Sequence, residues 1–106
     1  MPTREEKREN YRAHIAQQEA ERQKYEDERG YQQEILAAID AGEFNDLWDA
    51  DDLEESLEVM REKTRGLIKH CEAKIRMCNV VIRSAQKNLD GVKVTPPPAG
   101  RRARKS

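Results

Sequence analysis

Residues 53–89 decide the fold, and they read LEESLEVMREKTRGLIKHCEAKIRMCNVVIRSAQKNL. Within this stretch, one row of mostly small residues recurs at every seventh position: Leu57, Thr64, Cys71, Cys78 and Ala85. A row of larger apolar residues runs beside it: Ile68, Ile75, Ile82 and Leu89. Two rows with this spacing form the a and d positions of a heptad repeat, which line one side of a helix. We therefore expect one helix over about residues 51–90, with this seam packed against another helix.

A second helix is predicted upstream, over about residues 4–41. Thr3 is a favourable N-cap residue, and Glu6 three positions later completes a capping box. Gly42 suits the position just beyond the last turn, where helices commonly adopt a left-handed backbone conformation. Only Gly30 interrupts the run, and a lone glycine costs about 1 kcal/mol relative to alanine. The helix either continues through Gly30 or bends there.

The segment between the two helices, residues 42–50, is short enough to favour antiparallel packing of its neighbours. Folding the chain back at the middle of this connector would bring Tyr31 against Met60 and Tyr25 near Leu67. Val, Thr, Phe and Tyr are scarce, which disfavours a sheet. The predicted fold class is therefore all-α, an antiparallel two-helix hairpin that resembles a coiled coil.

The hairpin has little apolar material for a thick core, since 36% of the residues are hydrophobic and 39% are charged. Further apolar residues widen the predicted second helix beyond one seam. A second apolar stripe indicates a second interface. We expect either a homodimer that forms a four-helix bundle or a permanent complex with another protein. The residues of this stripe are Val59, Met60, Leu67, Met77, Val80 and Val81.

Charge is segregated along the chain, although the formal net charge is only −1. Residues 43–60 contain eight Asp/Glu and no Lys/Arg, whereas residues 61–106 contain thirteen Lys/Arg and three Asp/Glu. Such blocks bear on partners and solubility rather than on fold. The acidic block favours a basic surface on a protein partner.

The C-terminal segment, residues 92–106, differs from the hairpin predicted over residues 1–91. Its TPPPAG run at residues 95–100 cannot continue a helix and favours an extended conformation. We expect a disordered basic tail that could contact nucleic acid only non-specifically, since it has no aromatic residue to stack on bases. The residues predicted to bind a polyanion are Arg101, Arg102, Arg104 and Lys105.

The connector combines large apolar side chains with acids. Trp48 is the only tryptophan, and tryptophan is enriched in interface hot spots. Two interpretations remain open: the apolar side chains plug the end of the hairpin, or they dock a partner. Both hold if Phe44 and Leu47 point inward and Trp48 points outward. The residues predicted to bind a partner are Phe44, Asp46, Leu47, Trp48, Asp49, Asp51 and Asp52.

Catalysis, metal binding and a cofactor are not expected. The sequence has no phosphate-binding glycine loop, nucleophile elbow or metalloprotease helix motif. Cys71 and Cys78 are seven residues apart, which is not a zinc spacing, and buried cysteines commonly pack as small apolar groups. The charged N-terminal residues from Arg4 onward exclude a signal peptide, and no apolar run is long enough to span a membrane. We therefore expect a cytoplasmic protein.

These features favour a non-enzymatic protein–protein interaction module, such as an adaptor, an assembly factor or an inhibitor of a larger protein. The alternative is a nucleic-acid-associated or scaffolding protein that oligomerises through its helices and contacts polyanion through its tail. Size, helical pattern and charge blocks resemble, in a general way, small accessory proteins encoded by bacteriophages, which act in the host cytoplasm. No single motif carries that resemblance.

Overall fold

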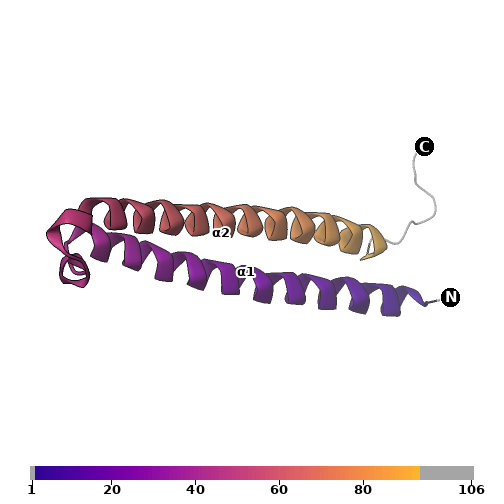
Figure 1. Ribbon diagram of the computed structural model, residues 1–106. Coiled ribbons are helices and arrows are strands. Elements are labelled where there is room, and N and C mark those ends of the chain that lie inside the picture. Colours follow the sequence, from indigo (N-terminus) through magenta and orange to yellow (C-terminus); the bar gives the residue numbers. More distant parts are fainter. Residues whose placement is uncertain (1, 94–106) are drawn as a thin grey trace. The chain divides into compact units, whose positions relative to one another are not determined.

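The computed structural model describes residues 2–93, and the chain forms a helical hairpin (Figure 1). Helix α1 spans Arg4–Asp40, a short 3-10 helix η1 spans Asn45–Leu47, and helix α2 spans Ala50–Lys93. The described residues contain no strand. The predicted all-α class and the two-helix hairpin are therefore confirmed.

The capping box at the start of α1 is confirmed by two reciprocal hydrogen bonds. The backbone N–H of Glu6 donates to the hydroxyl of Thr3 over 3.1 Å, and the N–H of Thr3 donates to the Glu6 carboxylate over 2.7 Å. These bonds satisfy donors that a helix start otherwise leaves free. The same bond to Thr3 stabilises the charged form of Glu6 and lowers its pKa below the ordinary value of 4.5.

Gly42 ends α1 as predicted, with a φ of +80°. The N–H of Glu43 donates to the carbonyl of Ala38 over 3.0 Å, and the N–H of Gly42 donates to the carbonyl of Ile39 over 3.1 Å. This pair of bonds is the Schellman motif, which satisfies the last carbonyls of a helix. A Cβ at Gly42 would lie 3.1 Å from the Nδ2 atom of Asn45, so both backbone and space favour glycine here.

Helix α2 is longer than predicted at both ends. It begins at Ala50, which makes Asp49 its N-cap position, and it continues through Gly91 to Lys93. The predicted end of this helix at about residue 90 was therefore too early, because half-buried Val92 adds one more apolar residue three positions beyond Leu89. Residues 92 and 93 of the predicted tail are thus helical, and its remainder lies outside the described residues. Helix α1 is continuous through Gly30.

The chain divides into two compact units, each of which contains one segment of α1 packed antiparallel on one segment of α2 (Figure 1). The first unit contains the chain up to Ala20 and from Cys78 onward, and the second contains Glu21–Met77. Buried residues of the first unit include Cys78, Ala85 and Leu89. Those of the second unit include Gln32, Ile39, Leu57, Thr64, Cys71 and Ile75.

The predicted seam of α2 is confirmed, and its row of small residues is the deeper of the two. All five members of that row are buried in their respective units. In the row of larger residues, Ile75 and Leu89 are buried, whereas Ile68 and Ile82 are half-buried. Small side chains therefore lie where α1 approaches most closely, and the larger ones flank them.

One polar side chain of α1 is buried in the interface with α2, which its polarity did not predict. Gln32 is only 7% exposed, and its Nε2 atom donates to a Glu28 carboxylate oxygen over 2.7 Å. On the α2 side of the interface, the buried hydroxyl of Thr64 donates to the carbonyl of Met60 in the same helix over 2.7 Å. The buried side chains of Gln32 and Thr64 thus each have a partner within their own helix, which avoids the cost of an unpaired donor.

The predicted register of the two helices was wrong by about one helical turn. Tyr31 is 59% exposed instead of packing on Met60. The ring of Tyr25 meets the ring of His70 edge to face, with centroids 6.4 Å apart, whereas the prediction placed Tyr25 near Leu67, three residues earlier. The physical reason is that α1 has its own seven-residue row, in which Tyr25 precedes buried Gln32 and Ile39, and Tyr31 is not part of it.

Candidate protein-docking site

The connector is a sequence of tight turns that ends in an extended residue. The N–H of Asn45 donates to the carbonyl of Gly42 over 3.2 Å, and the N–H of Leu47 donates to the carbonyl of Phe44 over 3.1 Å. Trp48 follows with extended backbone angles of −131° and 156°. This extended residue carries the chain from η1 into the first turn of α2 and places the indole against that helix.

The connector residues predicted to bind a partner have different surroundings. Phe44 and Trp48 are half-buried, whereas Leu47 is 62% exposed. The arrangement in which Phe44 and Leu47 both point inward, under which both interpretations of the connector would hold, is therefore not observed, because Leu47 is exposed to solvent. The four predicted acids, Asp46, Asp49, Asp51 and Asp52, are all exposed.

A groove of about 350 Å³ lies between Trp48 and the first turns of α2. Apolar side chains form most of its surface, and one carboxylate lies at its edge. Among the predicted docking residues only Trp48 lines it. The remaining four residues of the lining were not predicted. Their helical spacing could have indicated them, since Glu55 and Val59, like Ser56 and Met60, are four residues apart on one face of α2. The full lining is Trp48, Glu55, Ser56, Val59 and Met60.

The groove suits a side chain that is apolar along its length and positive at its end. Val59 is 63% exposed and offers an apolar contact beside the indole of Trp48. The carboxylate of Glu55 could pair with an ammonium or guanidinium group, and an indole face also attracts a cation. The groove belongs to residues 43–60, which contain eight Asp/Glu and no Lys/Arg, so the local charge favours a positive group.

An ion pair on the neighbouring face fixes the start of α2 against the end of α1. The Nε atom of Arg61 lies 2.9 Å from an Asp40 carboxylate oxygen, and a second nitrogen of Arg61 lies 3.7 Å from Glu58. The hydrogen bond to Asp40 is the main reason that the pKa of Arg61 is raised. Arg61 is therefore already paired with acids and is not among the residues that line the groove.

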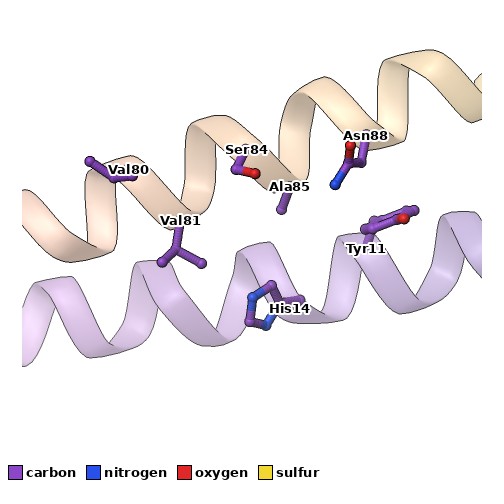
Figure 2. Close-up of a pocket in the computed structure, with 7 residues that line it drawn as sticks. All are labelled: Tyr11, His14, Val80, Val81, Ser84, Ala85 and Asn88. Atoms are coloured by element: carbon purple, nitrogen blue, oxygen red, sulfur yellow. The ribbon is translucent and has the colours of Figure 1, made fainter.

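The other unit has a hollow of about 440 Å³ near the N-terminal part of α1. Figure 2 shows Tyr11 and His14 on α1, with Val81 and Ala85 pointing toward them from α2. Val80, Ser84 and Asn88 complete the lining, and none of the seven residues is acidic or basic apart from His14. This surface is suited to apolar contact rather than to acid–base chemistry.

The two cysteines lie in separate units, and both are buried and free. Burial is the main cause of a raised pKa at the Cys71 thiol, and the charge of Glu28 adds to it. A raised pKa keeps the thiol neutral and poorly nucleophilic. Within residues 2–93, no group of three or more His, Cys, Asp or Glu side chains is arranged to hold a metal ion. No described helix is both long and apolar enough to cross a membrane.

The four basic residues predicted to bind polyanion lie outside the described part of the chain. Within that part, the groove beside Trp48 is the feature that joins a predicted docking residue to a defined surface. No protein-family model, curated protein or solved structure matches this chain.

Proposed function

We propose that the protein is a non-enzymatic interaction module that binds another protein through the groove beside Trp48 and the outer face of α2. An adaptor, an assembly factor and an inhibitor all fit this class. Support comes from the large apolar side chains that α2 leaves in solvent. Leu67 is 39% exposed, and Met77 and Val80 are each more than half exposed. Exposed apolar groups of this size are typical of interaction surfaces.

The groove itself is the observation that carries the proposal. It places the only tryptophan beside exposed Val59 and the carboxylate of Glu55, within an acidic segment. Interface hot spots combine a buried aromatic anchor with surrounding polar groups. A partner that inserts a lysine or arginine would cover the apolar wall with its methylene groups and pair its charge with Glu55.

Two substitutions test the proposal by pull-down from nuclease-treated cell extract. Trp48→Ala removes the apolar wall, and Glu55→Lys reverses the charge at the edge of the groove. We expect each to reduce partner recovery at least about tenfold, because truncating a hot-spot residue commonly costs 2 kcal/mol or more. Glu19→Lys is the matched control, since Glu19 is exposed on α1 and outside the groove.

Circular dichroism separates docking from folding in the same variants. Helicity should be unchanged in Trp48→Ala if the indole serves mainly to bind. Loss of helicity would show that Trp48 is a plug of the hairpin end, and the docking role of the groove would be rejected. Unchanged recovery with both variants, together with intact helicity, would also reject it.

The second candidate is a nucleic-acid-associated or scaffolding protein. Exposed basic side chains along α2 favour it, and the basic residues of the C-terminal segment add to them. The exposed basic residues of α2 include Lys63, Lys69, Arg76, Arg83 and Lys87. Phosphate contacts weaken steeply with salt because they release counterions, whereas docking through Trp48 does not. Recovery that disappears on nuclease treatment, or falls steeply with salt, would support this second candidate.

A further inference from the structure

The outer face of α2 carries apolar residues that no part of the described chain covers. Val59, Met77 and Val80 are each more than half exposed, and they lie on the side of the heptad repeat opposite the seam with α1. We propose that a second copy of this chain binds there, with its α2 antiparallel to the first and related to it by a two-fold axis. This inference rests on the proposed function and names the partner of the outer face.

The row of charged residues along one edge of this face carries the argument. It changes sign along the helix, with acids in the first half and bases in the second. All five members are exposed, and none forms an ion pair with another residue of the described chain. They recur at every seventh position: Glu55, Glu62, Lys69, Arg76 and Arg83.

An antiparallel two-fold pair brings this row of one copy along the same row of the other. If the axis passes beside Lys69, the Glu62 carboxylate of each copy faces Arg76 of the other. Glu55 of each copy then faces Arg83 of the other. The symmetry makes four opposite-charge pairs, while the long Lys69 side chains at the axis can extend into solvent. A parallel two-fold pair would instead bring this charged row beside the opposite edge of the other copy's face, so that the acids and bases of the row would not meet.

The row of residues along the opposite edge of this face is mostly apolar, and the same two-fold axis places it along the same row of the other copy. Its row contains Leu53, Met60, Leu67, Lys74 and Val81, again at every seventh position. Leu67 is 39% exposed, and antiparallel pairing brings Leu67 of the two copies together at the axis. Leu53 and Val81 are half-buried, and Val81 points toward α1 (Figure 2). One edge therefore offers burial of apolar surface, and the other offers charge complementarity, for a single choice of register.

This register also fills the groove beside Trp48 with chemistry that it suits. Val80 of the second copy arrives at Ser56, and Arg83 of the second copy arrives at Glu55. The groove has an apolar wall and one carboxylate, so it receives one apolar and one positive side chain. The basic side chain that the groove selects is thus present on the chain itself.

The test is an exchange of charges between two variants of the full chain. The first variant carries Glu55→Arg and Glu62→Arg, and the second carries Arg76→Glu and Arg83→Glu. Each variant alone places like charges at all four contacts, whereas an equimolar mixture restores opposite charges at all four. Sedimentation velocity measures the molar mass of each sample, and circular dichroism measures its helicity.

We expect the wild-type protein to sediment as a dimer. Each variant alone should dissociate at a concentration on the order of 100-fold higher than the wild type, because four weak attractions become repulsions. The equimolar mixture should form a one-to-one dimer. If either variant loses helicity alone, recovery of helicity on mixing is the corresponding result. A control with Glu19→Arg and Glu34→Arg, both exposed on α1, should dimerise like the wild type.

A monomeric wild-type protein would overturn the inference, as would variants that dimerise unaided or a mixture that fails to associate. If the wild-type protein is a monomer and Trp48→Ala still reduces recovery of another protein, the proposed function is kept and only the pairing of two copies is rejected. Conversely, a dimer that obeys the charge exchange but is indifferent to Trp48→Ala would retain the antiparallel pairing. It would reject docking in the groove.

Discussion

Thr3 and Glu6 show at the scale of single residues how a local pattern can be interpreted without tertiary information. Their side chains bond to backbone groups only three positions away, so the sequence alone specifies the contact. Trp48 is the contrasting case. Its role depends on Val59 and Met60, which come near it only after η1 and the first turns of α2 have formed.

The lowered pKa of Glu6 predicts a local dependence on pH. Because the folded-state pKa is below the ordinary value of 4.5, the capping bond stabilises the helix start fully above about pH 4.5. That contribution is lost as the pH falls through the lowered value, when the carboxylate becomes protonated. An NMR titration should show the Glu6 carboxyl group titrating below the ordinary value of 4.5, and the Thr3 amide shift should follow it.

Thr3→Ala provides the complementary test of the capping box. It removes the hydroxyl that accepts the Glu6 N–H, and loss of an N-cap side chain costs about 1 kcal/mol. Hydrogen exchange should become faster in the first turn of α1 only, and the pKa of Glu6 should move toward its ordinary value. Unchanged exchange in that turn would show that the capping bonds do not hold the helix start.

At the scale of elements, the sequence predicted the features that depend on one helix and missed those that depend on two. Its periodicity located the seam of α2, and Gly42 located the end of α1. The register was missed because seam positions recur every turn, so several alignments satisfy the same pattern. The buried position of Gln32 was missed because its polarity argues for solvent until its bond to Glu28 is known.

Gly30 and Gly42 form a matched pair for testing how the helix and its end are stabilised. A Cβ at Gly30 would meet no atom within 4 Å, so Gly30→Ala should stabilise the protein by about 1 kcal/mol through helix propensity. Gly42→Ala should destabilise it by about 1–2 kcal/mol, because Gly42 has a φ of +80°. Urea denaturation measures both changes. Shifts of the same sign would contradict the assignment of Gly42 as the left-handed helix end.

At the scale of the whole molecule, the hairpin depends on a narrow apolar seam within a chain that is 39% charged. The buried residues of α2 lie along the side that faces α1, and many charged residues of this helix remain in solvent. Long polar helices are marginal in isolation, and most helical stability comes from packing of the apolar face. Folding of α1 and α2 should therefore be coupled through the seam.

Ile75→Asp tests that coupling, because Ile75 is only 8% exposed in the middle of the seam. Removing a large buried aliphatic side chain costs about 2–5 kcal/mol, and burying an unpaired carboxylate adds to that cost. Total stabilities are about 5–15 kcal/mol, so most of the helicity measured by circular dichroism should be lost at 37 °C.

Tyr31→Asp is the control that separates the seam from general loss of apolar surface. Tyr31 is larger than Ile75, but it is 59% exposed and lies outside the seam of α1. Its replacement should change the free energy of unfolding by less than about 0.5 kcal/mol, as for other exposed positions. Equal destabilisation by the two substitutions would support the packing of Tyr31 on Met60 that the sequence predicted. Loss of helicity with Ile75→Asp alone would establish that one seam folds both helices.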